Sequence, residues 1–266
     1  MDRDRGRTNT LRRREWLVKF APDTGCFPTG RHYPGIAHLL RVNVMGLANE
    51  IEAETSVVDL PLAAIDTETT GRDPTVDRIV EVALVFCDAG EVGERRRWLV
   101  NPERPIPKEA QEVHGIDDDM VRDAPRFSEI APEFEAALTG RLALAYNAPF
   151  DRGFLQAEFT RTASVIGSGC WALRREIEWI DPLTWVRELQ RNERSRALGE
   201  VCARLGIALE KAHSAAADAE AALRVLLAIL PDARVPKTYG AFVKEQKRLA
   251  QEQAHDRSRW RSRQKR

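Results

Sequence analysis

Residues 61–231 alternate short apolar runs with segments in which apolar side chains recur at helical spacing, and this alternation constrains the fold more than any other feature. The apolar runs are typical of strands and cover residues 62–65, 78–87, 97–100, 142–146 and 178–180. The helical segments cover residues 127–138, 150–159, 198–205 and 215–230, and a further helix begins at Asp181-Pro182. This order predicts an α/β domain whose mixed sheet begins with antiparallel strands and carries helices on its faces.

The same pattern divides the chain into three parts. Residues 1–60 are predicted to form an N-terminal extension that is partly helical, because apolar side chains within 35–53 recur at near-helical spacing. Residues 61–231 form the patterned domain, and residues 232–266 form a basic C-terminal tail. The tail begins with an amphipathic helical pattern and ends in an Arg-rich stretch around Trp260. This composition suits either contact with a phosphate backbone or a solvated tail.

Composition and charge exclude several classes of protein. The 41 Lys and Arg residues balance 41 Asp and Glu residues, but the basic residues concentrate near both ends and the middle is acidic. Hydrophobic residues make up 43% of the chain, which excludes a disordered or fibrous protein. No apolar stretch approaches the ~20 residues that span a bilayer, and we expect no secretory signal. The widely spaced cysteines, without a C-x-x-C pair, predict a reducing, cytoplasmic location.

Two acidic residues stand where the first apolar run ends. Asp66 and Glu68 are two positions apart on a predicted strand, so their side chains point to the same face. Two carboxylates side by side repel each other unless one takes up a proton or a cation lies between them. Because oxygen ligands favour Mg²⁺ or Mn²⁺, the pair predicts either a divalent metal site or a solvated strand end.

Further polar residues open two later helices. Asp151 follows the apolar run at 142–146, at a position where a carboxylate can also serve as a cap or dipole partner. His213 precedes the predicted N-cap Ser214, and Asp218 lies one turn inside the next helix. Taken alone, His213 could be a loop histidine bonded to the backbone. Together with the first acidic pair, these residues predict a converging set suited to two-metal phosphoryl hydrolysis, with a histidine base.

The three motifs, in this order, resemble those of the DnaQ-like 3′–5′ exonucleases of the DEDDh group. The first motif is Asp66-Thr67-Glu68-Thr69-Thr70-Gly71, the second runs from Asn147 to Asp151, and the third joins His213, Ala215 and Asp218. The resemblance covers residues 61–231. It implies a ribonuclease H-like fold, with a mixed five-stranded sheet flanked by helices and with N- and C-terminal extensions.

The resemblance also implies catalytic roles. Asp66, Glu68 and Asp218 would bind the catalytic metal, with Asp66 bridging to a second ion. Asp151 would hold that second ion through water, and His213 would be the general base. The implied cofactors are two Mg²⁺ or Mn²⁺ ions.

The implied substrate is a nucleic acid, DNA or RNA, with a free 3′ end that is cleaved to nucleoside 5′-monophosphates. Thr67, Thr69 and Asn147 would contact this substrate, and no membrane partner is expected. One alternative is a proofreading subunit whose tail binds a DNA polymerase. Two others are a non-catalytic nucleic-acid-binding module and an adaptor whose basic ends recruit partners.

Overall fold

A computed structural model describes residues 46–48, 50–162, 170–209 and 214–264 of the chain. Its strands are β1 (Leu62–Thr69), β2 (Ile79–Asp88), β3 (Glu91–Leu99) and β4 (Leu142–Leu144). Its α-helices are α3 (Lys108–His114), α4 (Asp118–Val121), α5 (Phe127–Leu138), α6 (Ala148–Thr162), α7 (Pro182–Leu189), α8 (Leu198–Leu205), α9 (Ala215–Ile229) and α10 (Tyr239–Gln264). Two short 3-10 helices, η1 (Val57–Asp59) and η2 (Trp171–Leu173), complete the described elements.

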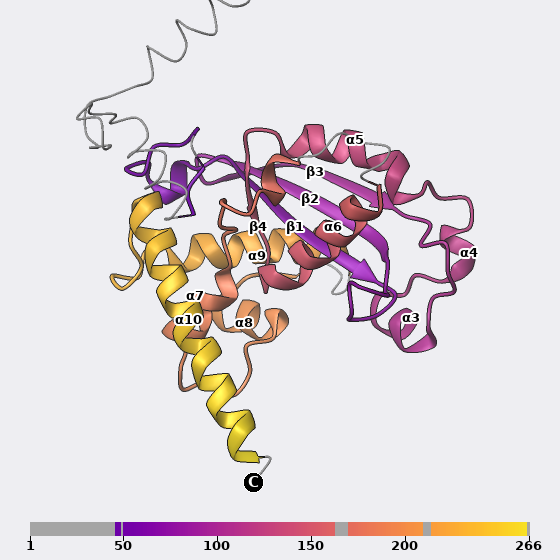
Figure 1. The fold of residues 1–266 in the computed structure, drawn as a ribbon. Helices are drawn as coiled ribbons and strands as arrows, with labels where there is room; N and C mark the ends of the chain where they lie inside the picture. The colour runs from indigo at the N-terminus through magenta and orange to yellow at the C-terminus, as the bar shows by residue number, and fades with distance from the viewer. Residues whose placement is uncertain (1–45, 49, 163–169, 210–213, 265–266) are drawn as a thin grey trace, which may run out of the picture.

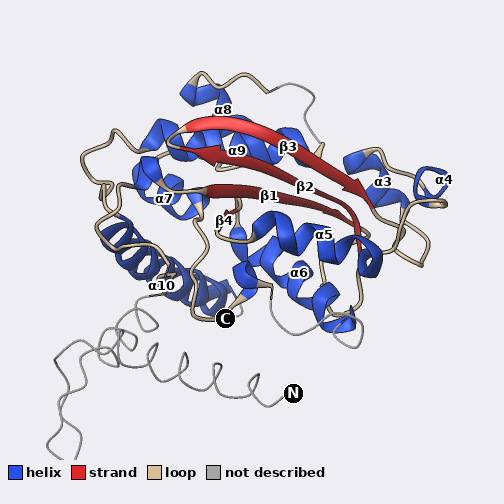
Figure 2. Ribbon diagram, turned by 90° about the horizontal axis from the view of Figure 1, so that it is seen from above, coloured by secondary structure: helices blue, strands red, loops and turns tan. Residues whose placement is uncertain are grey.

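The sheet in the described part of the chain has the order β3-β2-β1-β4. The pairs β1–β2 and β2–β3 are antiparallel, whereas β4 runs parallel to β1. Helix α9 covers one face of the sheet, and α5 and α6 lie on the other (Figures 1 and 2). The predicted mixed α/β fold with an antiparallel start is therefore confirmed.

The predicted fifth strand is reduced to a single contact among the described residues. Ile180 forms an isolated parallel bridge with Leu144, and no longer ladder is seen there in the described chain. The reason is local, because Asp181 already caps helix α7 and Pro182 follows it. The Asp181 carboxylate accepts a hydrogen bond of 3.0 Å from the Leu183 amide, so the chain leaves the sheet at once.

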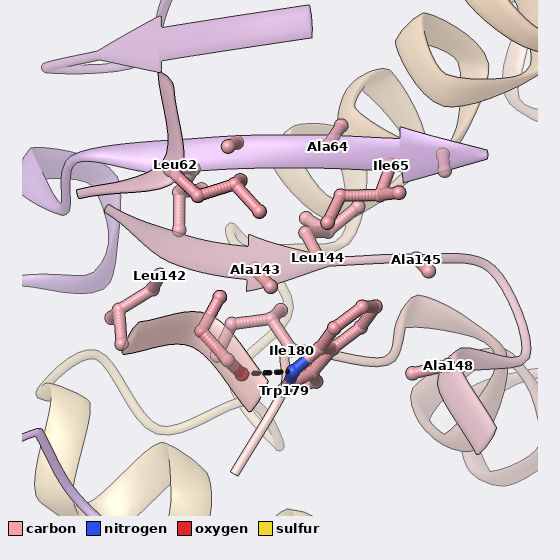
Figure 3. Packing of buried hydrophobic residues seen from close by; sticks show 14 of the residues in the cluster. Leu62, Ala64, Ile65, Leu142, Ala143, Leu144, Ala145, Ala148, Trp179 and Ile180 are labelled. Carbon is pink, nitrogen blue, oxygen red and sulfur yellow. Dashed lines mark hydrogen bonds between the residues drawn. The ribbon is translucent and has the colours of Figure 1, made fainter. Parts of the chain in front are cut away.

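Strand β1 is the centre of the core. Its first four residues, from Leu62 to Ile65, are buried because β2 and β4 flank the strand and helices cover both faces. Figure 3 shows side chains of β1 beside those of β4, with Trp179 in the same cluster. The Trp179 indole donates a hydrogen bond of 2.7 Å to the Ala172 carbonyl, so this large buried side chain leaves no polar group unpaired. The core thereby fixes the direction in which β1 presents its acidic end.

The first turns of helix α10 pack against the rest of the described chain. The Tyr239 hydroxyl accepts a hydrogen bond of 3.0 Å from the Ala48 amide. The Phe242 ring lies 4.8 Å from that of Trp185 on α7, and Gln246 bonds both Trp179 and Asp181 through its side chain. The solvated-tail alternative therefore fails for the first turns of α10. Most of the residues that follow Leu249 on the helix are exposed, and Figure 1 shows this end projecting beyond α7.

The prediction of a helix within residues 35–53 is wrong for the part of that segment that the structure describes. Residues 46–48 and 50–53 form turns and loop, and the rest of that segment lies outside the described residues. Gly46 has a φ of 81°, a left-handed conformation that interrupts a helix. Its carbonyl accepts a hydrogen bond of 2.8 Å from the Glu178 amide. No described helix is long and apolar enough to cross a bilayer.

Candidate active site

Three carboxylates meet where β1 ends and α9 begins. One oxygen from each of Asp66, Glu68 and Asp218 lies within 4.8 Å of the others. The two β1 residues share a face through strand alternation, as the sequence predicts. Asp218 joins them because α9 packs on β1 and carries this residue in its first turn, where the Ser214 hydroxyl accepts a hydrogen bond from the Ala217 amide. The side chains are half-buried.

The electrostatics of this cluster favour a bound cation. Burial raises the pKa of Asp66 well above its ordinary value, and the charges of Asp151 and Glu68 raise it further. Burial and then the charge of Asp218 raise the pKa of Glu68 to about 7. The charged neighbours that raise these two pKa values are themselves carboxylates. Such a set either binds protons or binds a positive ion.

Asp151 is held beside the cluster by strand β1. Its Oδ1 accepts hydrogen bonds from the Thr67 amide at 3.0 Å and from the Thr67 hydroxyl at 2.8 Å. The side chain is 3% exposed. Burial raises its pKa to about 7, and the hydrogen bonds from Thr67 act in the opposite direction. The structure therefore brings Asp151 to β1, within electrostatic reach of Asp66.

The predicted substrate contacts have different environments. Thr67 is buried, and both its amide and its hydroxyl donate hydrogen bonds to Asp151, so its contact with substrate stays a prediction. Thr69 is also buried, and its hydroxyl donates a hydrogen bond of 2.6 Å to the Gly71 carbonyl. Asn147 is exposed and has a φ of 72°. Its backbone amide donates a hydrogen bond of 3.1 Å to the Asp181 carboxylate. Of these three, Asn147 has the side chain most open to a ligand.

His213 lies outside the described residues, so its predicted place beside the cluster stays a prediction. The structure does describe the next residue, Ser214, whose side chain caps α9 as predicted. The cap fixes the start of the helix that carries Asp218.

Sequence reasoning missed a further carboxylate, that of Glu81. This β2 residue pairs across the sheet with Glu68 and is 1% exposed. Its carboxylate forms an ion pair with Arg97 on β3 and accepts a hydrogen bond of 3.0 Å from the Ala215 amide. Glu81 thus attaches the first turn of α9 to the sheet. The available signal was a single Glu within the apolar run from Ile79 to Cys87.

The motifs and the fold agree with a known family. The exonuclease family described as RNase_T matches residues 63–226, a range that contains the whole carboxylate cluster. The chain belongs to this exonuclease family. The resemblance to DnaQ-like exonucleases is therefore confirmed, and the described domain is an exonuclease domain.

Relatives of this exonuclease domain include parts of bacterial DNA polymerases. The chain is 32% identical over 183 residues to a DNA polymerase III PolC-type protein of Bacillus subtilis (strain 168), which is 69% of this chain and 12% of that protein. It is 35% identical over 200 residues to a DNA polymerase III subunit epsilon-like protein of Rhodobacter capsulatus, covering 73% and 27% of the two chains. The chain thus spans only a small part of these relatives.

Solved exonucleases share the fold of the domain. The structure of E. coli exonuclease I in complex with a dT13 oligonucleotide gives a TM-score of 0.56 at 22% identity, covering 64% of this chain and 41% of that one. Exonuclease X in complex with 5′ overhanging duplex DNA gives a TM-score of 0.52 at 23% identity, covering 68% and 99%. At this level of identity the likeness establishes the fold alone.

The carboxylate cluster of this exonuclease domain fits a divalent metal. The donor set consists of oxygens, which hard cations such as Mg²⁺ and Mn²⁺ prefer. The three donor oxygens are close enough to share one ion, and the raised pKa values of Asp66 and Glu68 mark the charge repulsion that an ion would remove.

Proposed function

We propose that this chain is a metal-dependent 3′–5′ exonuclease that hydrolyses nucleic acid from a free 3′ end to nucleoside 5′-monophosphates. The observation that carries the proposal is the convergence of Asp66, Glu68 and Asp218 within 4.8 Å, inside a domain of the exonuclease family. A nucleic-acid-binding module without activity would have no need for this concentration of repelling charge.

Each acidic residue has a separate part in the proposal. Asp66, Glu68 and Asp218 would hold one Mg²⁺ or Mn²⁺ ion, and Asp66 and Asp151 would hold a second. Such ions, when bound, neutralise charge on a phosphate and make water a better nucleophile. Asp151 suits a positioning task because two hydrogen bonds from Thr67 fix its orientation.

His213 would accept the proton of the attacking water. An imidazole has a pKa near neutrality and can take a proton at physiological pH. The proposal for this residue rests on its sequence position, directly before the Ser214 cap of α9, the helix that carries Asp218.

One preparation with defined oligomers tests the activity. DNA and RNA labelled at the 5′ end would be incubated with Mg²⁺ or with EDTA, and the products resolved by length. We expect stepwise shortening from the 3′ end and none in EDTA or with Asp66→Asn. The matched control is Asp59→Asn, an exposed acid outside the cluster. Normal turnover by Asp66→Asn would refute the proposed site.

A second candidate function is that of a proofreading subunit. Its support is that the relatives include DNA polymerase III PolC-type and epsilon-like proteins. Gel filtration of this chain with a bacterial DNA polymerase III subunit tests it, since a subunit should co-elute and a free-standing enzyme should not. Assembly with a polymerase would place the chain in the cytoplasm, as the cysteine pattern also predicts.

A further inference from the structure

A groove near Asp151 is lined by three arginines. It has a volume of about 580 Å³ and is lined by the start of α6, by α7 and by the middle of α10. Arg152, Arg187 and Arg257 line it from these three helices, and so do Asn147 and Gln253. Asp181, which lines the groove, also raises the pKa of Asp151 through its charge, so the groove lies within electrostatic reach of that carboxylate.

The three arginines of this groove differ from neighbouring arginines in their ion pairing. In the part of the chain that the structure describes, none of the three arginines forms an ion pair within 4.0 Å, whereas Arg191 and Arg248 nearby do. Burial lowers the pKa of Arg187, and the charge of Arg257 lowers it further. Glu178 and Asp181 also line the groove, and their charges raise the pKa of Arg152 and of Arg187, respectively. Within the described chain, neither carboxylate forms an ion pair with the three arginines. Guanidinium groups gathered in this way favour an anionic ligand.

The face of α10 that lines the groove continues beyond it. Gln246, Ala250, Gln253 and Arg257 line the groove, at the three- and four-residue spacing of one helical face. Trp260 and Arg261 are the next positions on that face, within about 60° of Gln246 around the axis. Trp260 is 60% exposed, although a large aromatic side chain is usually buried. Figure 1 shows this end of α10 extending past α7.

We propose that the groove and this face of α10 bind the upstream phosphate backbone of a single-stranded nucleic acid whose 3′ end lies at the carboxylate cluster, with Trp260 stacking on a base. The inference rests on the proposed exonuclease function and adds the path of the substrate. Helix α10 lies outside the family match at 63–226, so this surface is an addition to the common domain.

The chemistry favours a nucleic acid strand over a protein partner. Arginines match phosphate oxygens with paired donors, and an exposed tryptophan between arginines is a stacking platform for unpaired bases. The nucleic acid must be single-stranded beside Trp260, because the faces of a base within a duplex are covered by the neighbouring base pairs. A polymerase surface is the competing occupant that the test must distinguish.

Binding in EDTA tests the groove without relying on hydrolysis. Fluorescence anisotropy would follow a labelled strand of about 16 nucleotides, the upper end of common site sizes. We expect Trp260→Ala to weaken binding by about 5-fold or more. We expect Arg257→Ala to lower the slope of log affinity against log salt by about 0.7. The control is Arg259→Ala, which removes the same charge about 200° away from Arg257 on the helix and should bind as the wild type.

A comparison of long and short substrates in Mg²⁺ separates the two proposals. Strands of about 4 nucleotides span less of the surface, so Arg257→Ala and Trp260→Ala should impair hydrolysis of these strands less than that of long strands. Arg259→Ala, outside the surface, should hydrolyse both lengths as the wild type does. On long strands, Arg257→Ala and Trp260→Ala should raise KM and leave kcat unchanged.

Normal binding by Arg257→Ala and Trp260→Ala in EDTA would overturn the proposal for the groove even if hydrolysis is observed. Weakened binding without any hydrolysis by the wild type would refute the exonuclease and keep the groove. Loss of polymerase co-elution, with unchanged nucleic-acid binding, would assign the surface to a protein.

Discussion

The carboxylate of Asp151 on α6 accepts two hydrogen bonds from Thr67, one from its amide at 3.0 Å and one from its hydroxyl at 2.8 Å. This contact ties α6 to β1 at the residue that stands between Asp66 and Glu68 in the sequence. Asp151 therefore has a defined orientation before any ion is bound. An acid that is positioned in advance loses less freedom when the substrate arrives.

Replacing Thr67 with valine removes the hydroxyl bond and keeps the shape of the side chain. We expect Thr67→Val to lower kcat and to reduce the free energy of unfolding by about 1 kcal/mol. Steady-state kinetics and urea unfolding measure the two effects. Thr162→Val is the matched control, because Thr162 is also buried and its hydroxyl donates to the Phe159 carbonyl at the other end of α6. Equal loss of kcat in both variants would show that Thr67 acts only through stability.

Neutralising one member of the cluster should stop the reaction and stabilise the fold. In EDTA at pH 8, Asp66→Asn removes a half-buried charge that repels its neighbours, so its Tm should lie above that of the wild type. In Mg²⁺ its turnover should be absent, and its Tm should gain less from the ion than the wild type does. Thermal melts with and without Mg²⁺ measure this. A lower Tm in EDTA would contradict the repulsion inferred for the cluster.

The pH dependence of stability follows from the raised pKa values. The pKa values of Glu68 and Asp151 rise from near 4 in the unfolded chain to about 7 in the folded one. The folded state then holds more protons than the unfolded state. The stabilisation that these two carboxyl groups provide is therefore complete below about pH 4 and is lost as the pH rises through about 7. Thermal melts in EDTA should therefore give a lower Tm at pH 8 than at pH 5.

Added Mg²⁺ provides the corresponding check. An ion competes with protons for the same oxygens, so it should raise the Tm more at pH 8 than at pH 5. Asp59→Asn, outside the cluster, should keep this difference, whereas Asp66→Asn should reduce it. A Mg²⁺ effect that is equal at both pH values would mean that the ion binds elsewhere.

The ion pair between Glu81 and Arg97 predicts an unequal response to its two partners. Glu81 is 1% exposed in its side chain, whereas Arg97 is 48% exposed. Arg97→Gln leaves a buried carboxylate beside the acidic cluster and should cost about 3 kcal/mol. Glu81→Gln leaves a guanidinium that water can reach, so it should cost less, about 1–2 kcal/mol. Urea unfolding of the two single variants and the double variant measures this order. The reverse order would mean that Glu81 is not held by Arg97.

Replacing the proposed base should affect rate and pH dependence together. We expect His213→Ala to lower kcat by about 10²–10⁴ and to remove the acidic limb of the pH–rate curve. His255→Ala, on the exposed part of α10, is the matched control and should change neither. An unchanged pH–rate curve in His213→Ala would assign the proton transfer to another group.

Local patterns were sufficient for several features of the site. Alternation along β1 predicted that Asp66 and Glu68 share a face, and Asp181 and Ser214 cap their helices as expected. These features depend on residues within a few positions of one another. Strand β3 shows the limit of such patterns, because it begins at Glu91 rather than at 97. Strand β3 lies at the edge of the sheet, and its polar first half is mostly exposed. This half therefore lacks the apolar pattern that marks a buried strand.

The sequence by itself determined the alternation of the main strands and helices, the fold family and the acidic residues that mark the site. Only the tertiary structure decided how those residues are held, because their partners are distant in the chain. Thr67 meets Asp151 across 84 positions, and Glu81 meets the start of α9 across 134. A hydrogen bond or ion pair across such a distance leaves no periodicity in the sequence. It forms only after the sheet and its helices have buried the core between them.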